Sequence, residues 1–193
     1  MLEQGIYEPS EDSYLMSETL AAEIPKLLKQ NPNIKFLEVG CGSGVNLETA
    51  KKSGIKLENI FCSDINIDSV YHCSNSGFNC IKSDLFEKFK GGVSVRGNLV
   101  PLMFDKILVD APCSGEGTIR SSPKTLLMWN INTIRTLSKL QKKLLESAIE
   151  ILKPKGEIVY STCTHAPEEN EGVLNYILEK FGNKIKIESI SLP

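Results

Sequence analysis

The chain has 193 residues, of which 41% are hydrophobic, and a formal net charge of −2. This length fits one globular domain with a substantial core, and we treat residues 1–193 as a single domain. No apolar run reaches the length of a membrane span and no basic-then-apolar leader is present, so we expect a cytoplasmic protein without membrane contact. The near-neutral charge excludes a global electrostatic attraction to nucleic acid.

Apolar segments and amphipathic helical patterns alternate along the chain. Strands are predicted at residues 34–39, 59–64, 78–82, 104–110, 157–162 and 184–190, and most are too apolar to have one face in water. Residues 89–103 indicate a loop-like connection. The alternation predicts an α/β fold with a doubly wound, mostly parallel sheet that binds ligands outside the carboxyl ends of its strands. Because only one strand-like segment follows residue 162, we expect the last strand of such a sheet to be missing.

Two helices are predicted in the second half. Apolar residues in 133–153 form one stripe, and Pro154 and Gly156 end this helix. The next helix is predicted from Pro167 to Gly182, with acidic residues in its first turn. Residues 120–155 carry eight Lys or Arg against two Glu. Such a basic stretch suits contact with nucleic acid but is also typical of a solvated helix face.

A glycine-rich segment, "FLEVGCGSGVNLETA", contains the first predicted strand and continues into a helix. Gly40, Gly42 and Gly44 let the backbone turn sharply and approach a ligand closely. The dinucleotide pattern GxGxxG is not satisfied, since Val45 stands where the third glycine should be. Together with Glu38 the segment has the form ExGxGxG, which favours S-adenosyl-L-methionine, a ligand with an amino-acid end and no pyrophosphate.

Two aspartates stand at the ends of the next two predicted strands. Asp64 ends the second strand, where a carboxylate can accept both ribose hydroxyls of a nucleoside. Asp84 follows the third strand, where the adenine edge would lie. Either aspartate alone is more commonly a helix cap. The three signals at the ends of consecutive strands resemble the cofactor site of Rossmann-like class I methyltransferases.

The first half also carries the segments "IYEPSEDSYLM" and "KSDLF". With the glycine-rich segment, they resemble the HemK-like glutamine methyltransferases over about residues 6–90, the predicted cofactor-binding half. The resemblance implies that Glu8, Pro9 and Asp12 help to close the cofactor pocket. An ordinary helix start, with Ser10 as cap and acids in the first turn, explains part of this segment equally well.

The second half resembles a different family. The HemK-like family has Asn-Pro-Pro-Tyr after the fourth strand, whereas this chain has Asp110-Ala111-Pro112-Cys113. The segments "VDAPCSGEGTIR", "LQKKLLESAIEILKPKGEIVYSTCT" and "PEENE" resemble the RNA cytosine-C5 methyltransferases of the RsmB/RsmF and NSUN type over about residues 100–180. Residues 104–193 are therefore the predicted catalytic half.

Cysteine chemistry explains these segments. Cytosine C5 becomes nucleophilic when a thiolate adds to C6 and a carboxyl group supports the ring at N3. Cys113 and Cys163 follow the predicted fourth and fifth strands, whose ends a sheet would bring together. The resemblance implies that Cys163 is the nucleophile, that Cys113 assists product release and that Asp110 holds the cytosine. Pro112 would fix the loop, and Arg120 would contact a tRNA or rRNA substrate, with Trp129 either stacking on RNA or buried in the core.

The other cysteines carry no comparable signal. The six cysteines show no CxxC pair and no ligand-like spacing with the two histidines, so we predict no metal site. A disulfide framework is not expected in a reducing compartment. Buried thiols often serve as small apolar residues, and this is our interpretation of Cys62, Cys73 and Cys80.

Three hypotheses for the function follow. The first is an RNA cytosine-C5 methyltransferase, and the second is a release-factor glutamine methyltransferase, which the missing Asn-Pro-Pro-Tyr opposes. The third is a cofactor-binding domain without turnover, because Asn46 stands where the RNA family has a lysine and the last strand is absent. The catalytic residues favour the first hypothesis, since fold-level similarity alone does not define the reaction.

Overall fold

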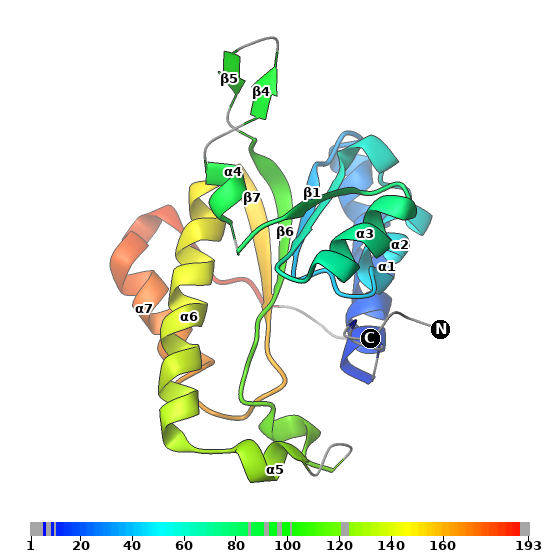
Figure 1. The fold of residues 1–193 in the computed structure, drawn as a ribbon. Coiled ribbons are helices and arrows are strands. Elements are labelled where there is room, and N and C mark those ends of the chain that lie inside the picture. The colour runs from blue at the N-terminus through cyan, green and yellow to red at the C-terminus, as the bar shows by residue number, and fades with distance from the viewer. Residues whose placement is uncertain are drawn as a thin grey trace.

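The computed structural model describes residues 6, 9, 11–84, 86–90, 93–95, 98–100, 102–120 and 124–189. A five-stranded sheet forms its centre (Figure 1). The strands are β1 (Phe36–Val39), β2 (Ile60–Asp64), β3 (Asn79–Lys82), β6 (Phe104–Asp110) and β7 (Leu152–Ser161). The helices are α1 (Glu11–Gln30), α2 (Val45–Lys52), α3 (Ile67–Asn75), α4 (Glu87–Lys90), α5 (Lys124–Met128), α6 (Ile131–Glu150) and α7 (Glu171–Phe181).

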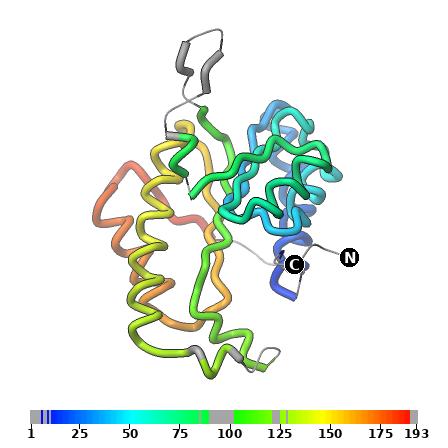
Figure 2. The backbone as a smooth tube through the Cα atoms, in the orientation of Figure 1, coloured from blue at the N-terminus to red at the C-terminus, as the bar shows by residue number. Residues whose placement is uncertain are grey.

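The strand order β3-β2-β1-β6-β7, with every neighbouring pair parallel, confirms the predicted doubly wound α/β sheet. The chain runs outward from β1 to β3 and then returns to the other side of β1 as β6 (Figure 2). The direction of winding therefore reverses between β1 and β6. In open α/β sheets, the crevice at such a reversal is where ligands bind.

The two faces of the sheet carry separate hydrophobic clusters, because successive side chains of a strand point to opposite sides. Phe36 and Leu108 face a cluster that includes Leu47 of α2. Leu37 and Ile107 face another that includes Leu144 of α6. In Figure 1, α1, α2 and α3 lie on one side of the sheet, and α6 and α7 on the other. Both faces are covered, as the apolar strands predict.

At the amino ends of the strands, away from the crevice where the winding reverses, one carboxylate connects three strands. Asp105, at the start of β6, accepts hydrogen bonds from the backbone N–H of Lys35 and from Lys153 Nζ, each at 2.8 Å. Its other oxygen accepts a hydrogen bond of 3.2 Å from Asn31 Nδ2. The amino ends of β1, β6 and β7 are therefore held together through Asp105.

Two elements predicted in the second half differ in the structure. Residues 184–190 do not form a strand: Gly182–Lys184 is a 3₁₀ helix, residues 185–189 have no regular structure, and residue 190 lies outside the described residues. Ile187 is 51% exposed, so this segment lacks the burial that would hold it in a sheet. The helix predicted from Pro167 begins only at Glu171, because residues 167–170 form a turn in which Gly172 N–H donates to Pro167 O.

The predicted connection at 89–103 contains secondary structure of its own. Strands β4 (Val93–Val95) and β5 (Asn98–Val100) pair antiparallel as a separate two-stranded sheet. This hairpin projects beyond the end of the central sheet in Figure 1. Within the described ranges, no helix combines the length and apolar character needed to cross a membrane.

Candidate active site

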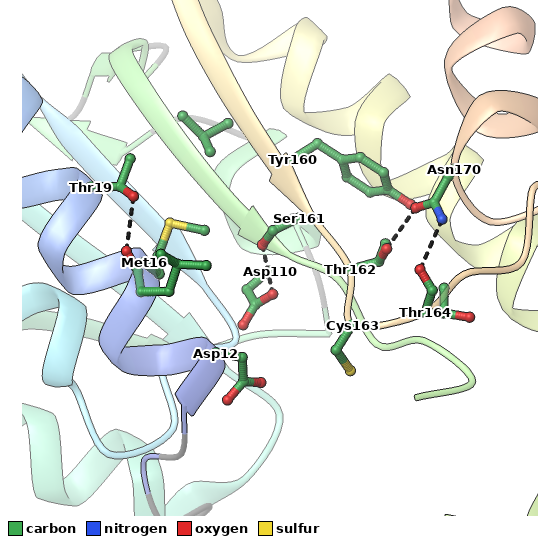
Figure 3. Close-up of a pocket in the computed structure, with 12 residues that line it drawn as sticks. Asp12, Met16, Thr19, Asp110, Tyr160, Ser161, Thr162, Cys163, Thr164 and Asn170 are labelled. Carbon is green, nitrogen blue, oxygen red and sulfur yellow. Dashed lines mark hydrogen bonds between the residues drawn. The ribbon is translucent and has the colours of Figure 1, made fainter. Parts of the chain in front are cut away.

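A cavity of about 460 Å³ opens between α1 and the carboxyl ends of β6 and β7. Asp12 from α1, Asp110 from β6 and Cys163 from the loop after β7 line it and point toward the same space in Figure 3. A second hollow of about 220 Å³ shares Asp12 and Cys163 with it. The predicted catalytic residues of two distant segments therefore meet at one opening.

The two predicted catalytic cysteines lie in direct contact. Cys113 Sγ is 3.0 Å from Cys163 Sγ, and the backbone N–H of Cys163 donates to Cys113 Sγ at 3.2 Å. The hydrogen bond from the Cys163 thiol lowers the pKa of Cys113, and the same bond raises the pKa of Cys163. Of the two thiols, Cys113 therefore loses its proton more readily in the absence of substrate.

The loops that carry the cysteines are tied to each other. Ser114 Oγ and Thr164 Oγ1, the hydroxyls that follow the two cysteines, are 2.7 Å apart. Gly117 N–H donates to Cys163 O at 2.9 Å. A Cβ atom added at Gly117 would lie 2.9 Å from that same carbonyl oxygen, closer than real Cβ contacts. Gly117 is therefore required for the close approach of the two loops.

The buried carboxylate of Glu169 holds the Cys113 loop in place. Its side chain is fully buried and accepts hydrogen bonds from Ser114 N–H at 3.1 Å and from Gln141 Nε2 at 2.7 Å. Gln141 Nε2 also donates to Pro112 O at 2.9 Å. Since Pro112 and Ser114 flank Cys113, this buried pair fixes the backbone on both sides of the cysteine.

Asn170 performs the equivalent task for the Cys163 loop. Its side-chain amide donates to Thr164 O at 3.0 Å and to Ala166 O at 3.2 Å. Its Oδ1 accepts a hydrogen bond of 2.6 Å from Thr162 Oγ1. The contacts to Thr162 and Thr164 hold the chain on either side of Cys163.

Asp110 stands at the end of β6 beside the cavity. Ser161 Oγ donates to its Oδ1 at 2.6 Å, across the β6–β7 pair. Although Asp110 is an exposed residue, its pKa is raised, chiefly because the surrounding protein displaces part of the water around the carboxyl group, and the Asp12 carboxylate adds to the shift. The hydrogen bond from Ser161 acts in the opposite direction. Asp110 is thus a carboxyl group that holds its proton more readily than a solvated aspartate.

The glycine-rich loop has the geometry of a ligand cradle. Gly40, Gly42 and Gly44 have φ values of 81°, 50° and 76°, in the left-handed region that favours glycine. A Cβ atom at Gly40 would meet nothing within 4 Å, so open space adjoins the backbone there. Asp64 accepts the N–H of Gly42 at 2.9 Å, which ties the predicted ribose-binding carboxylate to the loop.

Glu38 and Asn46 form a buried pair beside this loop. Asn46 Nδ2 donates to Glu38 Oε1 at 2.9 Å, and Asn46 Oδ1 accepts from Ser17 Oγ at 3.1 Å. Glu38 Oε2 is buried and has no hydrogen-bond partner among the residues that the structure describes. Burial raises the pKa of Glu38 to about 8. An unpartnered buried oxygen beside an open glycine loop fits a cofactor that would complete its bonding.

The remaining predicted residues are more dispersed. Asp84 and Arg120 are exposed, and Pro9 is half-buried. Glu8 lies outside the described residues. Trp129 is 45% exposed, so it is not a core residue, and its Nε1 donates to Glu116 Oε1 at 2.5 Å.

The sequence analysis assigned no role to three residues that organise the site. Glu169, Asn170 and Gln141 each form hydrogen bonds that hold a cysteine loop, but none of them lies at the end of a strand. The signal for the first two was present in "PEENE", where acidic residues and an asparagine follow the Cys163 loop within a few positions. Gln141 stood out only as a polar residue in a helix, and its complete burial is a tertiary feature.

The sheet order, the switch-point crevice and the glycine loop after β1 define a Rossmann-like methyltransferase fold. A family model described as 16S rRNA methyltransferase RsmB/F matches residues 79–192. The chain belongs to this family.

Similar sequences agree with this membership. The chain is 47% identical over 97 residues to ribosomal RNA small subunit methyltransferase F of Aeromonas salmonicida, covering 50% of this chain and 20% of that protein. It is 41% identical over 110 residues to the protein of the same name from Vibrio cholerae, covering 57% and 23%. The chain therefore matches only about a fifth of the length of these curated relatives.

Solved structures show the same fold. NSun6 from Pyrococcus horikoshii with SFG has a TM-score of 0.66 and 21% identity, over 91% of this chain and 45% of that one. A methyltransferase homologue from Pyrococcus horikoshii has a TM-score of 0.57 and 28% identity, over 85% and 50%.

Proposed function

We propose that this chain transfers a methyl group from S-adenosyl-L-methionine to C5 of a cytosine in ribosomal or transfer RNA. The observation that carries the proposal is the 3.0 Å contact between Cys113 Sγ and Cys163 Sγ beside Asp110. A second thiol at this distance has a use in a reaction that must first form and then break a bond between sulfur and the substrate. An rRNA substrate, named in the family description, would place the reaction in the cytoplasm.

We assign the cofactor to the first half, residues 1–90, and the chemistry to residues 104–193. Glu38, Asp64 and the loop Gly40–Gly44 would hold S-adenosyl-L-methionine, with Asp84 near its adenine. When bound, this cofactor supplies an electrophilic methyl group. Asp12 would close the pocket from α1, since it lines both hollows together with Cys163. Glu8 and Pro9 precede it in the chain and stay assigned to this closing segment.

The nucleophile in our proposal is Cys163. Its thiol releases the proton to solvent, and the Cys163 thiolate then adds to cytosine C6. The electron pair of the C5–C6 double bond moves toward C5, which becomes able to accept the methyl group. Asp110 would hydrogen-bond the ring at N3 and stabilise the charge that the addition creates, and its raised pKa favours the protonated form that can donate there.

Product release needs the second cysteine. After methyl transfer, the C5 proton leaves to water and the bond between C6 and Cys163 Sγ breaks, which restores the aromatic ring. The Cys113 thiol lies close enough to donate a hydrogen bond to the departing sulfur. Cys113 therefore acts after methyl transfer, so its loss should leave the addition step possible and slow the release.

The RNA would approach the open side of the cavity. Arg120 is exposed on the loop after Cys113, and Trp129 presents nearly half of its surface. A guanidinium and an aromatic ring suit contacts with phosphate and unstacked bases. Part of the basic stretch serves the fold instead, since Lys153 pairs with Asp105 at 2.8 Å.

The test uses labelled S-adenosyl-L-methionine with rRNA and tRNA as substrates. We expect label in 5-methylcytosine, a stable protein–RNA adduct with Cys113→Ala, and neither product nor adduct with Cys163→Ala. Absence of an adduct with Cys113→Ala, while the wild type turns over, would contradict the assigned roles. Label in a release-factor glutamine would instead support the second hypothesis. The family match does not support that hypothesis, and the chain lacks its Asn-Pro-Pro-Tyr motif after β6. Cofactor binding without transfer to either substrate would support the third.

A further inference from the structure

Four of the six cysteines converge beneath the glycine-rich loop, although they are dispersed in the sequence. The Sγ atoms of Cys41, Cys62 and Cys73 all lie within 4.8 Å of one another, and all three residues are buried. Cys80 Sγ is 3.7 Å from Cys41 Sγ. The four residues come from the loop after β1, from β2, from α3 and from β3, where Cys62 and Cys80 are direct cross-strand partners.

The spacing of these sulfurs is close to that of a tetrahedral thiolate site. A zinc ion bonded to sulfur at about 2.3 Å has neighbouring sulfurs separated by about 3.8 Å. The Cys41–Cys80 distance already has this value, and each pair among Cys41, Cys62 and Cys73 would need to close by about 1 Å or less from a separation below 4.8 Å. A disulfide would need a far larger change, because its sulfurs are about 2.05 Å apart.

The chemistry of the clustered side chains also suits a soft cation. Soft thiolate ligands select zinc and similar cations over magnesium or calcium. The simple packing role that the sequence suggested for Cys62, Cys73 and Cys80 needs no such convergence of sulfur atoms.

We propose that Cys41, Cys62 and Cys73, with Cys80 as the fourth ligand, bind one thiophilic divalent cation of the Zn²⁺ type. Each thiol that coordinates releases its proton to solvent, and no electron is transferred. Cys41 belongs to the glycine-rich loop, and the Cys73 thiol contacts Gly42 O at 3.8 Å. The bound cation therefore fixes the loop that is assigned to the cofactor, although the cation site itself is independent of the methyl-transfer reaction.

The experiment uses the full chain with Cys113→Ser and Cys163→Ser as background, so that only the four clustered thiols remain. Titration with Co²⁺ should give one ion per chain and the intense visible absorption of tetrahedral thiolate cobalt, which Zn²⁺ then displaces. Adding Cys62→Ser or Cys73→Ser should weaken binding at least tenfold. Ser63→Ala, a change at the buried neighbour of Cys62, is the matched control and should leave binding intact.

A second measurement decides the proposal if the added Cys62→Ser and Cys73→Ser variants fail to fold. In the background protein, alkylation of the four thiols is followed by mass spectrometry with and without Cd²⁺, since burial alone slows the reaction in both samples. Slower alkylation of Cys41, Cys62 and Cys73 with one equivalent of Cd²⁺ supports the site. Unchanged rates, cobalt spectra without thiolate character, or a disulfide that forms in place of metal binding would overturn it.

Discussion

Glu169 and Gln141 form a buried pair: Gln141 Nε2 donates to the Glu169 carboxylate at 2.7 Å while both residues bond to the backbone around Cys113. Replacing Gln141 with Leu leaves the Glu169 carboxylate with fewer hydrogen-bond donors in a fully buried site. Because hydrogen bonds to charged groups contribute about 1.5–3 kcal/mol, we expect a loss of this size in the free energy of unfolding. Chemical denaturation measures it. Lys139→Ala, on the exposed face of the same helix, is the control and should change stability by less than about 0.5 kcal/mol.

The hydrogen bond between the two cysteines predicts unequal reactivity. Cys113 should react with iodoacetamide at a pH below that of an ordinary thiol, because the hydrogen bond from Cys163 stabilises its thiolate. Cys163→Ala removes that donor, so the midpoint of the Cys113 rate against pH should move upward. Peptide-resolved mass spectrometry follows both cysteines. A midpoint that stays in place after Cys163→Ala would show that the Sγ–Sγ contact does not control the acidity.

Glu38 predicts a pH dependence of stability. Its pKa is raised from 4.5 to about 8 in the folded protein, so the folded state keeps a proton that the unfolded state releases. The contribution of Glu38 to stability is therefore greatest below pH 4.5, falls as the pH rises toward 8, and then levels off. Between pH 4.5 and 7 the contribution lost is on the order of 3 kcal/mol.

The matching variant is Glu38→Gln, which keeps the size of the side chain but does not ionise. Near neutral pH it should unfold at higher denaturant concentration than the wild type, and its stability should lose this component of the pH dependence. We also expect it to bind S-adenosyl-L-methionine more weakly, because the unpartnered Oε2 is replaced. A variant that is less stable than the wild type at pH 8 would contradict the assigned protonation state.

Gly117→Ala tests the close approach of the two catalytic loops. The added methyl group would lie 2.9 Å from Cys163 O, so the Cys163 backbone must move. We expect at least a tenfold loss in the rate of methyl transfer with a smaller effect on S-adenosyl-L-methionine binding. Gly182→Ala is the matched change: it introduces a left-handed alanine but meets nothing within 4 Å, and it should leave the rate unaffected. Equal rates of methyl transfer for Gly117→Ala and the wild type would show that catalysis does not depend on the close approach of the two loops at Gly117.

The sheet was predictable because its determinants are local. Apolar segments with few polar interruptions indicated the five central strands, and the glycine pattern indicated the loop after β1, which has positive φ at all three glycines. The strand expected at 184–190 was wrong because alternation of apolar residues does not supply a neighbouring strand. Whether such a segment pairs depends on tertiary context.

The site was predictable only in part. Strand ends predicted that Cys113 and Cys163 would approach each other, since parallel neighbours bring their carboxyl ends together. The buried support from Gln141 and Glu169 was not predictable, because a polar residue in a helix is normally expected at the surface. The cysteine cluster was also missed: its members are separated by up to 39 positions and show no ligand-like spacing.

Asp105 ties the amino ends of three strands to one carboxylate, at the edge of the sheet remote from the cavity. At the cavity itself, α1 and the strand ends are separate walls. The same two strands, β6 and β7, are thus cross-linked at their amino ends and carry cavity-lining residues at their carboxyl ends, so a change at Asp105 would act on the site along the whole length of the strands.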